Sequence, residues 1–311
     1  MEKWQLQQLQ GLPLEIKIQK SLIRIKEWYE QFNGEVYVSF SGGKDSTVLL
    51  HLVRTLYPSV VGVFSDTGLE YPEVRNFVKT IDNIIWIKPE LNFKQVIDKW
   101  GYPIISKEQS QYIYDAKNTK SEKQLDIRLN GNKYGMGKVS EKWKYLIDSD
   151  IKISDKCCNE LKKKPFKKFE KETGLHPILG VMATESIHRQ KEYLNTGCNA
   201  FNSKRPISRP LGFWTEEDIL LYLVLNKLEI PSVYGDIISD DENKSLKLSR
   251  LTRTGCMFCA YGVHLEKGVN RFQQMKNTHP KMYEYCMKPK EEGGLGMAYV
   301  LDVINVPYKN I

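Results

Sequence analysis

The chain has 311 residues, 41% of them hydrophobic, and a formal net charge of +8. This length can bury a substantial core and allows one large domain with a smaller appendage. No apolar run approaches the roughly 18 residues that cross a bilayer, and the N-terminal stretch lacks the apolar segment of a secretory signal. We therefore expect a cytoplasmic protein with no membrane partner. Six cysteines are too few for a disulfide-stapled fold, so they require a chemical explanation.

Strands and helices are expected to alternate along the chain. Runs of β-branched and aromatic residues predict strands over 35–40, 60–64, 84–87 and 178–182. Apolar residues at helical spacing, with capping signals, predict helices over 14–32, 47–56, 71–81, from Glu185 onward behind a Thr184 cap, and after Thr215 with Asp218 three residues on. This alternation predicts an α/β fold with a doubly wound, mainly parallel sheet.

The pattern also suggests where the chain divides. We expect an N-terminal helix over 1–33, a nucleotide-binding domain over 34–235, and a small C-terminal unit over 236–311 that carries two cysteines. Between about 106 and 150 the pattern fades into polar residues and glycines, which we interpret as an insertion or a mobile flap.

The most informative motif is the turn between the first strand and its helix. It is formed by Ser41, Gly42, Gly43, Lys44, Asp45 and Ser46. Glycines after a buried strand let successive N-H groups and the positive end of the next helix face an anion, and Lys44 adds a full charge. The spacing differs from that of the Walker A loop of kinases and GTPases. The turn therefore predicts a phosphate site, although a turn without a ligand remains possible.

This turn resembles the signature of the PP-loop ATP pyrophosphatases. Three later segments, 65–73, 180–189 and 209–215, resemble the branch that contains phosphoadenylyl-sulfate (PAPS) reductases and DNA-phosphorothioation ATP pyrophosphatases. The resemblance covers roughly residues 35–260 and implies an adenine nucleotide alpha hydrolase-like fold. It implies a bound ATP or adenylyl sulfate nucleotide, with further contacts from Phe64, Ser65, Asp66 and Thr67.

Two charged features outside the turn are further candidates. Glu185 and Arg189 are one helical turn apart, so both can face the site, and the Arg189 guanidinium suits a phosphate or sulfate. A surface ion pair is the simpler interpretation. The Lys162–Lys171 segment is rich in lysine, which is consistent either with a solvated helix face or with contact to a nucleotide or nucleic acid.

Four cysteines form two pairs, namely Cys157 with Cys158 and Cys256 with Cys259. The two pairs can complete a four-thiolate set only if the fold closes the long gap between them. The combination resembles assimilatory adenylyl-sulfate reductases and implies a [4Fe-4S] cluster. Zinc, a redox-active set and a merely buried set remain open, because spacing does not separate iron from zinc. Cys198 and Cys286 fit no pair and are expected to be buried thiols.

Within the resembled family the chemistry divides. Sulfonucleotide reductases attack a sulfate with a cysteine in a C-terminal motif that this chain lacks, and they tend to carry a degraded phosphate loop, whereas this loop is intact. We therefore expect an enzyme that cleaves ATP to AMP and pyrophosphate with Mg2+, using Lys44, Asp45 and Arg189, to activate a substrate for sulfur transfer. Its further partner would be a sulfur donor or a thioredoxin-like protein. A reductase and a non-catalytic nucleotide-binding module remain alternatives.

Overall fold

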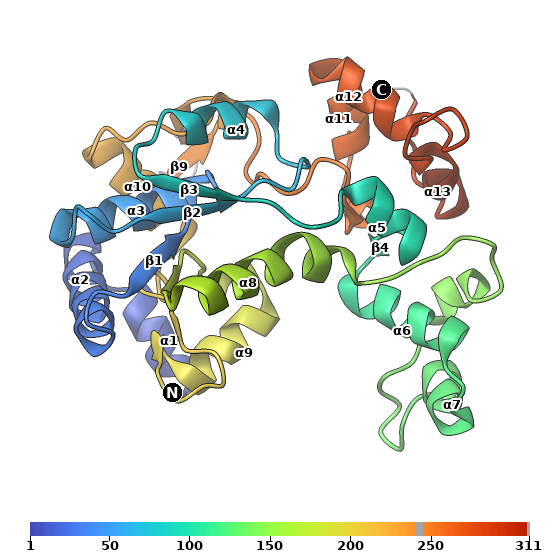
Figure 1. Cartoon of the computed structure of the whole chain (residues 1–311), viewed down its shortest axis with the longest axis horizontal. Coiled ribbons are helices and arrows are strands. Elements are labelled where there is room, and N and C mark those ends of the chain that lie inside the picture. Colours follow the sequence, from blue (N-terminus) through green and yellow to red (C-terminus); the bar gives the residue numbers. More distant parts are fainter. Residues whose placement is uncertain (241–244, 310–311) are drawn as a thin grey trace. The chain divides into compact units, whose positions relative to one another are not determined.

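The computed structural model describes residues 1–240 and 245–309 (Figure 1). The chain forms two compact units. The first unit comprises Met1–Asp66, Glu70–Lys88 and Pro165–Thr254, and the second comprises Thr67–Leu69, Pro89–Lys164 and Gly255–Ile311. In the described ranges, no helix combines the length and the apolar character needed to cross a membrane.

The first unit is built on a six-stranded sheet in the order β3-β2-β1-β5-β7-β6. The strands are β1 (Val36–Ser39), β2 (Gly62–Ser65), β3 (Ile84–Ile87), β5 (His176–Leu179), β6 (Asn199–Ala200) and β7 (Ile207–Ser208). All pairings are parallel except the one between β6 and β7. The central strand is β1, where Val38 is in register with Gly62 of β2 and Ile178 of β5.

Helices cover both faces of this sheet (Figure 1). They are α1 (Lys3–Gln10), α2 (Leu14–Gln31), α3 (Lys44–Leu56), α4 (Pro72–Lys79), α8 (Lys164–Thr173), α9 (Ile187–Thr196) and α10 (Glu216–Leu225). Side chains alternate along a strand, so Val36 and Val38 join the large core that includes α2, α3 and α10, whereas Tyr37 packs on the other face with Phe169 of α8. The expected doubly wound α/β sheet is confirmed.

A buried ion pair joins α2 to the beginning of α10. Lys17 Nζ lies 2.6 Å from Asp218 Oδ2, and the Lys17 side chain is 2% exposed. Asp218 also closes a capping box, because its carboxylate accepts from the Thr215 N-H while the Thr215 hydroxyl accepts from the Asp218 N-H. The capping signal expected at Thr215 is therefore confirmed, and the carboxylate has a second partner in Lys17.

The second unit is mainly helical. Its elements are α5 (Phe93–Lys99), β4 (Ile104–Ile105), α6 (Lys107–Asn118), α7 (Glu122–Asn130), η1 (Glu141–Leu146), the π-helical turn η2 (Asn159–Lys163), β10 (Ala260–Tyr261), η5 (Val263–Leu265), α11 (Arg271–Thr278), α12 (Pro280–Met287) and α13 (Met297–Val303). The short strands β4 and β10 pair in parallel. This pairing joins the chain before residue 165 to the chain after residue 254.

Several sequence-based boundaries differ from the structure. The polar stretch near 106–150 contains α6 and α7, whose Ser106 and Ser121 caps stabilise helices with few apolar residues. The expected boundary after 235 also shifts, because the antiparallel strands β8 (Ile237–Asp240) and β9 (Ser245–Leu248) belong to the first unit. No helix begins at Glu185. A 3-10 turn, η3 (Ala183–Glu185), comes first, and Ser186 rather than Thr184 caps α9.

Candidate functional site

The turn 41–46, which we call the phosphate loop after the site that the sequence predicts, lies where the strand order of the sheet reverses. The chain leaves β1 toward β2 and β3 on one side, and later continues through β5 on the other side of β1. In open parallel sheets, ligands bind at the carboxyl ends of the strands at such a switch point. The loop follows β1 directly, and Gly180, which follows β5, approaches α3 so closely that a Cβ there would lie 3.1 Å from the Asp45 carbonyl oxygen.

Packing explains the first glycine of the loop. Gly42 has a φ of 71°, which a side chain would strain, and a Cβ would lie 2.5 Å from Val78 and 2.9 Å from Val74 of α4. The loop hydroxyls bond within the loop. Ser46 Oγ accepts from the Ser41 N-H at 3.2 Å and lies 3.1 Å from Ser41 Oγ. Hydroxyl groups of the loop therefore lie close to its amides.

Lys44 is held between two carboxylates. Its side chain is 2% exposed, and Nζ lies 3.3 Å from Asp45 Oδ1 and 3.1 Å from Glu216 Oε1. Burial lowers the pKa of Lys44, but the charges of Asp45 and Glu216 outweigh burial, so the net shift is upward. Lys44 is therefore a buried, charged ammonium group at the beginning of α3, as an anion site requires.

Asp45 lies among further charges. Burial raises the pKa of Asp45, the Lys44 ammonium opposes this, and the negative charges of Glu216 and Glu185 raise it further. Glu185 accepts a 2.7 Å hydrogen bond from the Met182 N-H and forms an ion pair with Arg189. The structure thus brings the Glu185 and Arg189 pair to the neighbourhood of Asp45, although Glu185 belongs to η3 and Arg189 to α9.

Sequence reasoning missed two residues at the loop. Glu216 is the first residue of α10, and Tyr234 is the last residue of η4 (Ser232–Tyr234). The Tyr234 hydroxyl accepts a hydrogen bond from the Lys44 N-H at 3.3 Å. From the sequence alone, Glu216 is an ordinary acidic residue in the first turn of a helix, and Tyr234 is an ordinary aromatic residue of the core. No local signal distinguishes either one.

The residues expected to contact the nucleotide at the end of β2 are buried. Phe64, Ser65 and Asp66 are at most 8% exposed, and Asp66 forms a 2.8 Å ion pair with Arg75 of α4. Thr67 is the first residue of the short segment assigned to the second unit, where its hydroxyl accepts from the Leu69 N-H. The chain therefore passes from the end of β2 directly into the second unit.

The four paired cysteines gather within the second unit. Burial raises the pKa of Cys157, and the charges of Cys256, Cys158 and Cys259 add to the effect, whereas Lys162 opposes it. Burial likewise raises the pKa of Cys259 to about 11, against a hydrogen bond from the Tyr261 backbone. The fold thus closes the gap between the two pairs. Across residues 1–240 and 245–309, no three His, Cys, Asp or Glu side chains are arranged to hold a metal ion.

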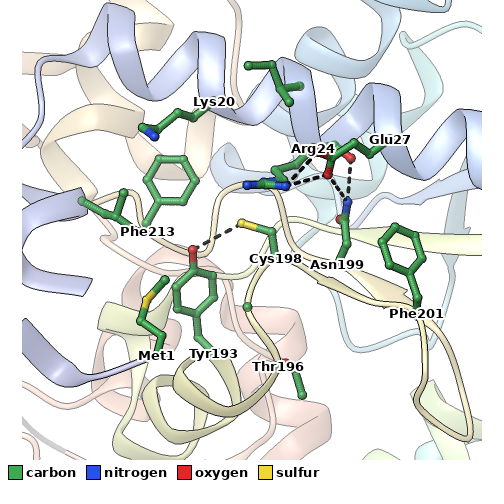
Figure 2. A pocket seen from close by; sticks show the side chains of 13 residues that line it. Met1, Lys20, Arg24, Glu27, Tyr193, Thr196, Cys198, Asn199, Phe201 and Phe213 are labelled. Carbon is green, nitrogen blue, oxygen red and sulfur yellow. Dashed lines mark hydrogen bonds and ion pairs between the residues drawn. The ribbon is translucent and has the colours of Figure 1, made fainter. Parts of the chain in front are cut away.

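The other two cysteines lie in different surroundings. Cys286 of α12 is 0% exposed, and burial raises its pKa. Cys198 lines a cavity of about 350 Å³ in the first unit, where its sulfur lies 3.3 Å from the Tyr193 hydroxyl (Figure 2). Burial raises the pKa of Cys198 as well, so both thiols are protonated at neutral pH. The cavity, beside Arg24 and Glu27 of α2, includes no residue of the phosphate loop.

The lysine-rich segment forms the end of η2 and most of α8. Pro165 and Phe169 are buried, whereas the lysines between them point outward and are largely exposed, with Lys164 paired to Glu160 at 2.7 Å. The segment is therefore an amphipathic helix with a basic outer face. Both interpretations offered by the sequence, a solvated face and a phosphate contact, are compatible with this geometry.

Comparison with known proteins identifies similar sequences. The family model of the phosphoadenosine phosphosulfate reductase domain matches residues 35–95 and 78–261. An uncharacterized protein of Methanocaldococcus jannaschii is 25% identical over 267 residues, covering 84% of this chain and 42% of that protein. The adenosine 5'-phosphosulfate reductase of Bacillus cytotoxicus is 32% identical over 89 residues, covering 26% of this chain and 38% of the reductase. The chain thus spans less than half the length of these relatives.

Two solved structures share part of the chain trace at low identity. The phosphoadenylyl-sulfate reductase from Candida auris, solved as a phosphate complex, has a TM-score of 0.39 at 14% identity and covers 75% of this chain and 90% of its own. The FMN adenylyltransferase of Candida glabrata has a TM-score of 0.41 at 14% identity and covers 73% of this chain and 62% of its own.

Proposed function

Because this chain belongs to the phosphoadenosine phosphosulfate reductase domain family, we propose that it binds ATP at the phosphate loop and cleaves it to AMP and pyrophosphate. The acceptor oxygen attacks the α-phosphorus, the bond from the α-phosphorus to the bridging oxygen breaks, and pyrophosphate leaves with that electron pair. The observation that carries this proposal is Lys44, a buried, charged ammonium group that belongs to the loop and begins α3. An adenylated substrate is then ready for displacement by sulfur.

The side chains at the loop have distinct roles in this reaction. The loop amides, the Ser46 hydroxyl and Lys44 bind the leaving pyrophosphate, where negative charge increases as the bond breaks. Arg189 exchanges its contact with Glu185 for a phosphate oxygen, since a guanidinium binds carboxylate and phosphate in the same fork geometry. Phe64 and Ser65, at the end of the buried strand β2, form one wall of the adenosine site.

The acidic side chains at the loop suit a magnesium ion. Asp45 Oδ1 is buried and its contact with Lys44 Nζ at 3.3 Å is an ion pair, so the carboxylate still has lone pairs for a metal ion or for metal-bound water. Carboxylate oxygens are preferred Mg2+ ligands, and Glu185 and Glu216 act electrostatically on the same carboxyl group. When bound, Mg2+ supplies neutralisation of the triphosphate charge.

The paired cysteines of the second unit lie near one another, although no three of the described side chains are arranged to hold a metal ion. Their four thiol groups are close enough for the charges of three to raise the pKa of Cys157, and the Tyr261 N-H donates to the sulfur of Cys259. The pKa values of Cys157 and Cys259 are both raised by burial, so binding of a metal would release the thiol protons. We propose that Cys157, Cys158, Cys256 and Cys259 hold a [4Fe-4S] cluster, which supplies redox or sulfur chemistry when bound. Anaerobic protein should then contain about four iron and four sulfide ions per chain. Stoichiometric zinc without sulfide would contradict the iron assignment.

The basic face of α8 supports a nucleic-acid substrate. Exposed lysines on one side of a helix attract the phosphate backbone of a nucleic acid, and such binding weakens steeply as the salt concentration rises. Sulfur would come from a donor protein or a thioredoxin-like partner. The test measures binding of a labelled oligonucleotide at several salt concentrations and in variants that lack these lysines. Binding that depends on neither the salt nor the lysines would contradict this part of the proposal.

A sulfonucleotide reductase is the second candidate function. It is favoured by the similarity to the Bacillus cytotoxicus reductase. It requires a cysteine nucleophile outside the cluster, and Cys286 is fully buried with a raised pKa, which opposes thiolate formation. The structure therefore favours ATP cleavage.

In the first arm of the test, anaerobic holoprotein is incubated with ATP and Mg2+. In the second arm it is incubated with a thiol reductant and either adenylyl sulfate or the 3'-phosphorylated form of adenylyl sulfate. Pyrophosphate and AMP from ATP, lost in Lys44→Met and retained in Cys286→Ser, would support the proposal. Sulfite formed at enzymatic rates and lost in Cys286→Ser would replace it with the reductase. Binding of ATP without turnover, even with added nucleic acid, would indicate a nucleotide-binding module.

A further inference from the structure

A hydroxyl pair from outside the signature motif caps the phosphate loop. The Tyr234 hydroxyl accepts from the Lys44 N-H at 3.3 Å and lies 2.7 Å from Thr254 Oγ1. A Cβ on Gly43 would lie 3.0 Å from the Tyr234 hydroxyl and 3.4 Å from Thr254 Oγ1. The glycine therefore lets both hydroxyls approach the loop backbone.

The bonding pattern of the loop indicates how these hydroxyls act. The first N-H groups of a helix have no partner within the helix, and a phosphate loop offers them to an anion. In this structure hydroxyl oxygens accept from the N-H groups of the loop and of the first residue of α3: Ser46 from the Ser41 N-H, Ser41 from the Gly43 N-H at 3.4 Å, and Tyr234 from the Lys44 N-H. Tyr234 thus has the same relation to the loop as the two signature serines.

A hydroxyl group can act either as a hydrogen-bond acceptor or as a hydrogen-bond donor. It accepts from an amide when no anion is present, and its own O-H can donate to an anion when one arrives. The Tyr234 bond is longer than the usual 2.7–3.2 Å range, so little is lost when the Lys44 amide turns to a phosphate oxygen. The hydroxyl is also well positioned, because the tyrosine is 2% exposed and its ring lies 6.0 Å from Lys44 Nζ.

We propose that Tyr234 and Thr254 are part of the anion site, with the Tyr234 hydroxyl donating to a phosphate oxygen that the loop holds and the Thr254 hydroxyl donating to the Tyr234 oxygen. This rests on the proposed function and extends its phosphate-binding set beyond the motif. The ligand class is the pyrophosphate group, either free or as the β and γ phosphates of ATP. Tyr234 acts on this group and not on the adenosine.

The experiment removes one oxygen at a time. Tyr234→Phe keeps the ring that fills the buried position, and Thr254→Val keeps the shape of the side chain. Calorimetry on the full chain measures Kd for inorganic pyrophosphate, ATP and AMP. We expect Tyr234→Phe to raise Kd for pyrophosphate and ATP roughly tenfold, as for a lost hydrogen bond to a charged group, and to leave Kd for AMP unchanged. Thr254→Val should have a smaller effect in the same direction.

The matched control is Tyr193→Phe, which removes a hydroxyl from an equally buried tyrosine in the same unit; this hydroxyl contacts Cys198 in the cavity whose lining includes no residue of the loop. It should change no Kd, and thermal unfolding should show that all variants fold. Unchanged or tighter pyrophosphate binding in Tyr234→Phe would overturn the inference, and so would an equal loss for AMP and pyrophosphate. If Lys44→Met weakens pyrophosphate binding and Tyr234→Phe does not, only this inference fails. If wild type does not bind pyrophosphate, the proposed function fails with it.

Discussion

Replacing Lys44 with methionine tests the central claim that this ammonium binds phosphate. The side chain is 2% exposed, so a methionine of similar length fills its space without exposing apolar surface. The substitution removes the positive charge and leaves Asp45 and Glu216 facing an incoming anion. Both consequences weaken nucleotide binding, so the direction of the effect is unambiguous.

The magnitude follows from the contacts that Lys44 exchanges. A hydrogen bond to a charged group contributes about 1.5–3 kcal/mol. To reach a phosphate, Lys44 must loosen its 3.1 Å contact with Glu216, whose side chain is 46% exposed. An ion pair exposed to that degree contributes at most about 1 kcal/mol. The net loss in Lys44→Met is therefore about 0.5–2 kcal/mol, which corresponds to a roughly 2- to 30-fold rise in Kd.

The assay is calorimetric titration of wild type and variants with pyrophosphate and with ATP at constant ionic strength. Glu216→Gln is the matched control, because it removes a competing negative charge and should tighten pyrophosphate binding by up to about fivefold. General damage to the loop would weaken binding in both variants. The charge argument is refuted if Lys44→Met binds as well as wild type, or if Glu216→Gln weakens binding as Lys44→Met does.

Three further predictions concern stability and the unpaired thiol. Lys17→Met should lower the free energy of unfolding by about 3–5 kcal/mol, because it leaves Asp218 as a buried carboxylate without its cation; urea denaturation showing a loss below 1 kcal/mol would contradict this. Burial lowers the pKa of His51 and of His176, so the unfolded state binds more protons at acid pH. Stability should therefore fall as the pH drops below about 6.5, and His51→Gln should flatten this decline in thermal scans. Cys286→Ser should keep full ATP cleavage, since its thiol is buried and protonated; loss of pyrophosphate release in a folded variant would show otherwise.

The sequence alone determined the strand-turn-helix unit in which the glycine-rich turn lies, and the binding of phosphate by this turn stays a prediction. Glycines, hydroxyls and a lysine are contiguous there, so the local backbone conformation and the charge are encoded within a few residues. The same holds for α10, whose Thr215 and Asp218 cap is complete within one turn. The strand at 84–87 was also located correctly, because its apolar run is short and clearly bounded.

Local patterns failed where capping chemistry outweighed apolar spacing. The helices α6 and α7 carry few buried residues, so their periodicity is weak, and serine caps start them. At residue 185 a carboxylate that bonds back to the Met182 N-H closes a 3-10 turn, and this delays the helix until Ser186 can cap it. Such competition between side chain and backbone is decided by geometry that residue type alone does not give.

Only the tertiary structure brought distant groups to the loop. The Tyr234 hydroxyl contacts the Lys44 amide although the two residues are 190 positions apart in the sequence. Glu216, at the beginning of α10, contacts the Lys44 ammonium group. In the sequence Tyr234 resembles any core aromatic residue and Glu216 any acidic residue at the beginning of a helix. Only their tertiary contacts distinguish them as candidate site residues. The two cysteine pairs illustrate the same division. Their spacing identified four candidate ligands, but the proximity of the pairs arises from tertiary contacts of the second unit, in which β10 pairs with β4 and Ile153 forms a bridge with Tyr102.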